Sequence, residues 1–100
     1  MAFSIEWTEL AIEDLEGAVS FIAADNPAAA EAVGNEIIRC VELLKDFPCL
    51  GPSYPRRART NIHEIIARKH YRVFYRVFEE RRLIEVLRVW HTSRDEPDLA

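Results

Sequence analysis

Arginine and histidine side chains recur in the last third of the chain, at spacings that could support chemistry on an anionic group. In YRVFYRV, residues 71–77, Arg72 and Arg76 fall on the same side of an extended strand. Further along lie Arg88, His91 and Arg94. Arginine can hold a phosphate or carboxylate with two parallel hydrogen bonds, and histidine can exchange a proton near neutral pH. These residues are therefore candidates for binding an anionic partner or for acid–base catalysis.

The alternation of YRVFYRV assigns its side chains to two faces of a strand. One face carries the core-like residues Tyr71, Val73, Tyr75 and Val77. The other face carries Arg72, Phe74 and Arg76, an apolar side chain flanked by two cations. A solvated face rarely needs arginine at this spacing. This pattern suits a peptide that combines acidic and apolar side chains, so we expect a partner on this second face.

The other histidines and the cysteines offer little chemistry. His63 and His70 are expected to be solvent-facing strand and turn residues, and they lack metal-ligand spacing. Cys40 and Cys49 form no CxxC motif, which argues for reduced packing residues and against a zinc site. Ser93 and Asp95 follow His91 and are expected to lie in a turn. The simplest interpretation of His91 is therefore a structural histidine that is hydrogen-bonded to this turn.

Three strands would carry these candidate residues. The segments 61–67, 71–78 and 83–91 have the composition of strands, and the polar segments 68–70 and 79–82 separate them as turns. The last strand has apolar residues at both alternating positions, which is typical of a central strand covered on both faces. The pattern predicts an antiparallel three-stranded meander.

A short strand and two helices precede the meander. Residues 2–7 alternate and are expected to join the edge of the sheet. Helical spacing of apolar residues then predicts one helix from Leu10 to Ala24, capped by Thr8, and a second from Pro27 to about Phe47. Because so short a connection joins them, the helices must be antiparallel.

The order β-α-α-β-β-β predicts an α+β fold with one domain spanning residues 1–100. The helical hairpin, about 8–47, should pack on one face of the sheet, about 61–91, and leave the second face partly open. Residues 92–100 are expected to form a polar tail that frays after Pro97.

Charge is unevenly distributed along the chain, whose net charge is −4 and whose pI is about 5.4. Ten acids and two bases occupy residues 1–50, whereas eleven bases and seven acids occupy residues 51–100. Either the acidic helices neutralise the basic strands, or the basic segment receives an acidic protein or nucleic acid. The acidic pI argues against non-specific nucleic-acid binding. No membrane-length apolar stretch and no signal peptide are found, so we expect a cytoplasmic protein.

Several segments taken in order resemble a known family. A short strand, an acidic hairpin with DNPAAA at its bend, LLKDFPCLG, YRVFYRV and IEVLRVWHTSRD together resemble the RelE/ParE superfamily of toxins from bacterial type II toxin–antitoxin operons. The resemblance runs from about Phe3 to Asp95, and the long hairpin is most similar to the ParE branch.

The resemblance implies a toxin held inactive in a hetero-oligomer with a ParD-like antitoxin, through which alone it would contact DNA. The ParE branch implies growth inhibition by binding DNA gyrase, plasmid stabilisation and no chemistry of its own. The RelE branch implies a ribosome-dependent mRNA endoribonuclease. A third possibility is a non-toxic antitoxin-binding module that acts in operon autoregulation. We favour the ParE-like interpretation, because nuclease branches are strongly basic and place a tyrosine or further bases near the final histidine.

Under this interpretation, the residues expected to bind the antitoxin are Arg72, Phe74 and Arg76, with Arg57 and Arg59 of the basic loop. Arg88, His91 and Arg94 would contact the target. Under the nuclease alternative, His91 would act as acid or base, with Arg72, Arg76 and Arg94 around the phosphate. We expect neither a metal nor another cofactor in either case.

Overall fold

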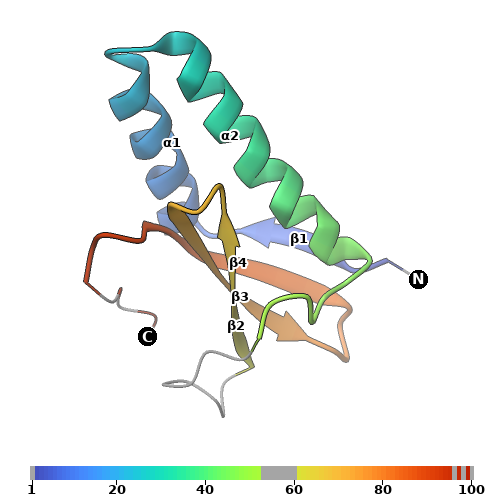
Figure 1. The fold of residues 1–100 in the computed structure, drawn as a ribbon. Coiled ribbons are helices and arrows are strands. Elements are labelled where there is room, and N and C mark those ends of the chain that lie inside the picture. Colours follow the sequence, from blue (N-terminus) through green and yellow to red (C-terminus); the bar gives the residue numbers. More distant parts are fainter. Residues whose placement is uncertain (1, 53–60, 96, 98, 100) are drawn as a thin grey trace.

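A computed structural model describes residues 2–52, 61–95, 97 and 99 of the chain (Figure 1). The elements are β1 (Ser4–Trp7), α1 (Glu9–Ala23), α2 (Pro27–Glu42), the 3₁₀ turn η1 (Leu43–Lys45), β2 (Ile62–Ala67), β3 (Tyr71–Phe78) and β4 (Leu83–His91). The predicted β-α-α-β-β-β order is confirmed.

Side-chain caps fix the starts of both helices. The Thr8 hydroxyl accepts a hydrogen bond from the Ala11 N–H at 3.1 Å, and the Asn26 amide oxygen accepts one from the Ala29 N–H at 3.1 Å. The second helix ends earlier than predicted, at Glu42 rather than near Phe47. The chain tightens there into a 3₁₀ turn, which is a common way to satisfy the last carbonyls of a helix.

The four strands form one sheet in the order β1-β4-β3-β2. β4 is central, as its composition predicted, and β3 pairs with β4 and β2 in antiparallel fashion. β1 joins the edge of β4, where it runs parallel and pairs Ser4 with Leu83 and Trp7 with Val86.

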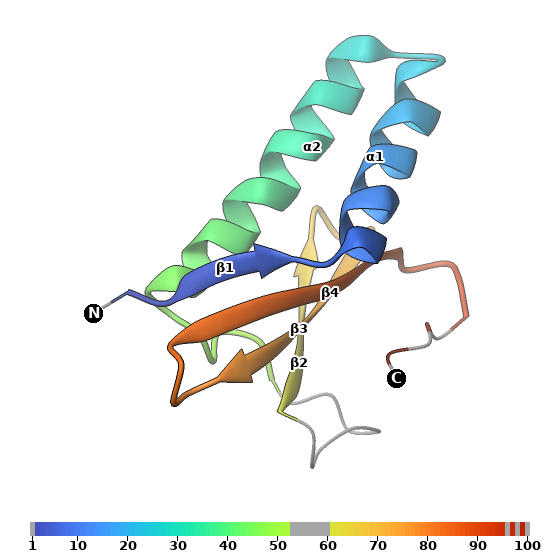
Figure 2. The same ribbon diagram turned by 180° about the vertical axis from the view of Figure 1, so that it is seen from behind.

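The helical hairpin covers one face of this sheet, and its turn projects beyond the strands (Figures 1 and 2). One buried cluster joins helix residues, including Ile37 and Val41, to Val73 of β3 and Val89 of β4. A second cluster contains Tyr75 and Val77 of β3 with Leu44 of η1 and Ile84 of β4. The helix-facing side of YRVFYRV is therefore the one that the sequence predicted.

A β-bulge in β4 interrupts the simple alternation. Phe74 pairs with Arg88 while Tyr75 pairs with Val86, so that Leu87 is the extra residue. The bulge lets Val86 and Val89 both face the helices although they are three positions apart. Trp90 consequently lies on the second face of the sheet, where it packs with Phe74.

The second face is partly covered by the chain's own C-terminal tail. Leu99 is only 6% exposed and packs in one cluster with Ile62, Phe74 and Trp90. The expectation that the tail frays near its end is therefore wrong at Leu99, because this leucine gains a buried apolar site on the sheet.

Gly51 anchors the loop after η1 to the sheet. Its N–H donates to the Tyr75 hydroxyl at 3.0 Å, and its carbonyl lies 2.8 Å from Nδ1 of His63. His63 is thus not simply solvent-facing, since its ring also stacks on Tyr75 with the ring centroids 5.4 Å apart. Burial raises the pKa of the Tyr75 phenol, although the hydrogen bond from Gly51 acts in the opposite direction.

Candidate functional site

Arg72 is already partnered within the sheet. Its Nε forms an ion pair with the Glu64 carboxylate of the neighbouring β2 strand, and both side chains are largely buried, at 15% and 20% exposed. The guanidinium also lies over the Phe74 ring, 4.7 Å from the centroid. An acidic partner would therefore have to compete with Glu64 for this arginine.

Phe74 is not the exposed apolar anchor that the sequence suggested. Its side chain is fully buried, because Ile62, Trp90 and Leu99 surround it on the second face. A partner could contact this ring only if the C-terminal tail moved away. Of the proposed antitoxin-binding residues, Arg57 and Arg59 lie outside the described residues.

Arg76 differs from Arg72 in its surroundings. It is half-buried and lies across from Ile62 of β2 and Glu85 of β4. Its buried Nε has no hydrogen-bond partner in the part of the chain that the structure describes. Arg76 is therefore the better candidate on this face for receiving an acidic group from outside.

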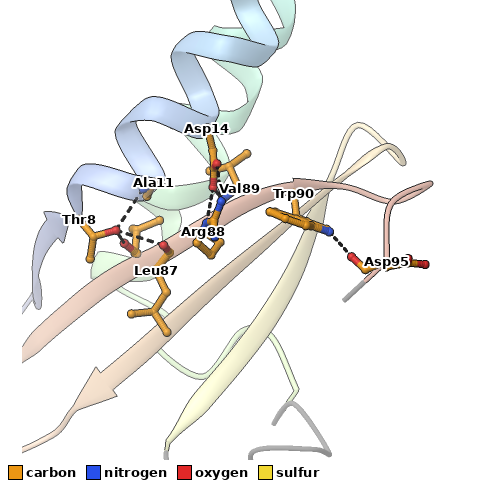
Figure 3. Close-up of polar contacts among 9 residues, drawn as sticks. Thr8, Ala11, Asp14, Leu87, Arg88, Val89, Trp90 and Asp95 are labelled. Carbon is orange, nitrogen blue, oxygen red and sulfur yellow. Dashed lines mark hydrogen bonds and ion pairs between the residues drawn. The ribbon is translucent and has the colours of Figure 1, made fainter. Parts of the chain in front are cut away.

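Arg88 is held by α1 (Figure 3). Its Nε and one terminal nitrogen donate to the two carboxylate oxygens of Asp14, at 2.7 and 2.8 Å. The same carboxylate accepts the backbone N–H of Val89 at 3.0 Å. The guanidinium also lies 4.7 Å from the centroid of the Trp90 ring. These contacts give Arg88 a structural role at the free edge of β4.

His91 lies on the helix-facing side of the sheet, opposite Arg72 and Arg76. It pairs with Tyr71, which meets its ring edge-on at 5.2 Å between centroids. Its Nδ1 accepts the Ser93 N–H at 3.1 Å and lies 2.6 Å from the Ser93 hydroxyl. The rings of His70 and His91 are stacked, with their centroids 6.0 Å apart. The predicted structural role in the turn at Ser93 is thus present.

Arg94 follows the turn and stacks on Trp90. Its guanidinium carbon lies 3.8 Å from the Trp90 ring centroid. The indole N–H of Trp90 in turn donates to the Asp95 carbonyl (Figure 3). Arg94 is exposed, so it remains accessible to a partner.

These residues do not converge on one point. Arg72 and Arg76 lie on one face of the sheet and His91 on the other, while Arg88 lies at the edge with Asp14. A catalytic acid or base must reach the same reacting group as the phosphate-binding side chains. Arg72 and Arg76 therefore do not share a site with His91, whereas Arg94 and His91 line one cleft.

A cleft of about 580 Å³, which the sequence does not predict, lies between α1 and the neighbouring ends of β3 and β4. Its lining consists of Glu13, Asp14, Gly17, Ala18, Phe21, Tyr71, Val89, His91, Ser93 and Arg94. Phe21 is 82% exposed beside it. The one available signal was that Phe21 falls outside the main apolar stripe of its helix.

Neither a metal site nor a membrane helix is found in the described part of the chain. No three His, Cys, Asp or Glu side chains there gather as metal ligands would. No helix among the described residues is both long and apolar enough to cross a bilayer. Cys40 and Cys49 are free thiols, and burial raises the pKa of Cys40.

The fold is shared with toxins of bacterial toxin–antitoxin systems. A chain of the chromosomal ParDE system from P. aeruginosa is 20% identical and superposes with a TM-score of 0.74, over 90% of this chain and 96% of that one. A chain of the M. tuberculosis RelBE2 toxin–antitoxin complex is 22% identical, with a TM-score of 0.65 over 91% and 99%. A mutant of E. coli toxin RelE in the free state is 19% identical, with a TM-score of 0.67 over 89% and 82%.

A family model narrows this class. The model of the ParE toxin of the type II toxin–antitoxin system parDE matches residues 5–96, nearly the whole chain. The chain therefore belongs to the ParE toxin family. No curated protein gives a significant match to this sequence.

Proposed function

We propose that this toxin inhibits growth by binding DNA gyrase, without catalysing a reaction itself, and that a ParD-like antitoxin neutralises it. The observation that carries the proposal is that His91 lies on the opposite face of the sheet from Arg72 and Arg76. The match to the ParE family supports the same choice of target.

The pairing of the arginines also favours binding over phosphate chemistry. Glu64 partners Arg72 and Asp14 partners Arg88, and both carboxylates are mostly buried. A scissile phosphate could reach these arginines only by displacing the carboxylates. If the carboxylates stayed, the phosphate would lie beside them, and neighbouring like charges repel strongly in a poorly solvated site. Two of the arginines on β3 and β4 are therefore poor candidates for stabilising a phosphate in a transition state.

The proposed partner is an antitoxin, which would form a hetero-oligomer with the toxin and provide its contact with operon DNA. The similarity in fold to chains from the ParDE system and from the RelBE2 complex supports this proposal. A toxin with gyrase as its target would act in the cytoplasm and could contribute to plasmid stabilisation.

The experiment that tests the proposed target compares two activities of the purified chain. Supercoiling by gyrase and cleavage of mRNA on translating ribosomes are measured for the wild type and for His91→Ala. We expect the wild type to inhibit supercoiling and to leave the mRNA intact. The His91→Ala variant should inhibit gyrase within about threefold of the wild type, because most single side chains at an interface contribute little to its affinity.

His70→Ala provides the matched control, since this histidine stacks on His91 but lies in the exposed turn before β3. A nuclease would behave differently, because removal of a general acid or base lowers the rate by about 10²–10⁴-fold. Ribosome-dependent cleavage that His91→Ala abolishes and His70→Ala preserves, with gyrase unaffected, would overturn the proposal.

A further inference from the structure

The outer edge of β2 is open at Ile66. β2 is the last strand of the sheet and pairs only with β3 among the described residues. The Glu64 N–H points away from β3, since it donates to the Pro52 carbonyl at 3.1 Å. Backbone groups alternate in direction along a strand, so the N–H and C=O of Ile66 point outward as well. No other described residue is hydrogen-bonded to these two groups.

An apolar groove of about 420 Å³ lies beside this open position, between β2, the end of α2 and the loop after η1. Leu43, Leu50 and Ile66 line the groove, and their side chains are 46%, 53% and 59% exposed. An open strand edge flanked by exposed apolar side chains favours the addition of another chain to the sheet. The outer side of β2 therefore has the features of an interaction surface.

The open position suits a second copy of the same chain. In an antiparallel ladder, two residues directly opposite each other can exchange both of their hydrogen bonds. A twofold axis at Ile66 would therefore satisfy the N–H and C=O of this residue in both copies at once. A strand of a different protein gains its affinity from a row of such bonds. Here the Pro52 carbonyl already occupies the next position, at Glu64.

The charges on either side of Ile66 complement each other in this arrangement. Glu64 and Arg68 each lie two residues from the axis, so Glu64 of one copy faces Arg68 of the other. Opposite charges at facing positions stabilise a strand pair. Arg68 is exposed in the turn after β2, so its side chain is accessible to a second molecule. A register with Arg68 on the axis would instead bring two arginines together.

We propose that the toxin forms a twofold dimer in which two β2 edges pair at Ile66. The sheets of the two copies become continuous, and the grooves beside the axis join and bury Leu43 and Leu50 of both copies. Because one residue pair supplies the backbone hydrogen bonds, the interface is small, and we expect a Kd on the order of 10 μM. The dimer goes beyond the proposed function, since it involves neither the antitoxin nor gyrase.

Sedimentation equilibrium of the purified chain measures this association, at concentrations from about tenfold below to about tenfold above the expected Kd. Ile66→Lys should raise the Kd at least about tenfold, which corresponds to about 1.4 kcal/mol, because it brings two cations together at the axis. Ile38→Lys is the matched control, since Ile38 is 44% exposed in the groove between α1 and α2. This control should dimerise within about twofold of the wild type.

A charge reversal tests the facing of Glu64 and Arg68. Arg68→Glu should raise the Kd about tenfold at low salt, because it sets two carboxylates against each other, and the effect should shrink at high salt. Lys69→Glu makes the same change of charge at the next residue, which is also exposed and also has positive φ. This control should stay within about threefold of the wild type.

A cysteine at the axis tests the register directly. Residues of a hydrogen-bonded pair have Cα atoms about 5.5 Å apart, a separation that a disulfide can span. In a chain that carries Cys40→Ala and Cys49→Ser, Ile66→Cys should therefore form a covalent dimer when oxidised glutathione is added. Lys69→Cys in the same chain is the control, because its two copies lie on opposite sides of the axis and should not be linked.

Each outcome decides for or against the dimer. Association that Ile66→Lys and Arg68→Glu weaken, with unchanged controls and a disulfide at position 66 alone, supports it. A wild-type chain that stays monomeric over the whole concentration range overturns it, as does a Kd that Ile66→Lys leaves unchanged. If the chain is monomeric and Ile66→Lys weakens antitoxin binding in titration calorimetry, the edge receives the antitoxin and not a second copy. Inhibition of gyrase is measured separately, so the proposed function can stand or fall without the dimer.

Discussion

At the scale of single residues, Asp14 takes the place that a longer β1 would have occupied beside β4. β1 ends at Trp7 opposite Val86, and the next backbone groups of β4 bind Thr8 and Asp14 instead. The same carboxylate also fixes Arg88 (Figure 3). One acidic residue of α1 thus joins the helix layer to the central strand and closes an exposed strand edge.

We predict that Asp14→Ala lowers the free energy of unfolding by about 3 kcal/mol, since it leaves the largely buried Arg88 guanidinium and the Val89 N–H without their carboxylate. Urea denaturation provides the measurement. The neighbouring Glu13→Ala serves as control and should change stability by less than about 0.5 kcal/mol. Equal stabilities of the two variants would contradict the structural role of Asp14.

Tyr75 gives a pH dependence whose sign can be stated. Its pKa is raised by burial, whereas an unfolded tyrosine ionises near about pH 10. Above that pH the folded chain binds more protons than the unfolded chain, so the free energy of unfolding should fall as pH rises. At pH 7, Tyr75→Phe should lower the free energy of unfolding by about 1 kcal/mol, because the variant lacks the hydrogen bond from Gly51. Because phenylalanine does not ionise, the free energy of unfolding of this variant should also fall less steeply at alkaline pH. Denaturation at pH 8 to 11 checks both effects.

The residues of the candidate site were predictable in their faces but not in their partners. Alternation alone placed Tyr75 toward the core and Arg72 on the other side. The pairing of Arg72 with Glu64 depends on the register of β2 and β3, which the turn after Ala67 determines. In that turn Arg68 and Lys69 both have positive φ, at 51° and 66°. Arginine and lysine do not favour positive φ, so the sequence does not indicate the conformation of this turn.

At the scale of elements, strands and helices were predictable because each carries a strong local pattern. Thr8 and Asn26 cap their helices as expected, and β4 begins and ends where predicted. The bulge at Leu87 was not predictable, because apolar residues on both sides of a strand are equally consistent with simple alternation. The cleft was missed for a related reason: it depends on how α1 crosses the sheet, which no single element specifies.

Two glycines in different elements should respond oppositely to the same substitution. Gly17→Ala within α1 should raise the free energy of unfolding by up to about 1 kcal/mol, since its Cβ meets nothing and alanine favours a helix. Gly51→Ala should lower it by about 2–3 kcal/mol, because its Cβ would lie 2.3 Å from the Glu64 carbonyl oxygen. Thermal unfolding of the two variants measures the contrast, and a stabilised Gly51→Ala would refute the tight packing of this loop.

At the scale of the whole molecule, the C-terminal tail completes a core on the second face of the sheet. The sequence suggested a polar tail, and its single leucine gave little sign of burial. Leu99→Ser should lower the free energy of unfolding by about 2 kcal/mol and shift tryptophan fluorescence to longer wavelength as Trp90 becomes wetter. Ile66→Ser, at a side chain 59% exposed, is the control and should change neither signal. An unchanged spectrum in Leu99→Ser would contradict the packing of the tail.

The parallel pairing of β1 with β4 has a consequence for biosynthesis. Residues 4–7 hydrogen-bond to residues 83–86, so the two ends of the chain must meet before the sheet is complete. Contacts this distant in sequence slow folding, because the intervening loop must close first. A nascent chain on the ribosome cannot form them until its last strand has emerged. The finished fold of this toxin therefore forms only after β4 has left the ribosome, so a partner that binds the completed sheet cannot act on the shorter nascent chain.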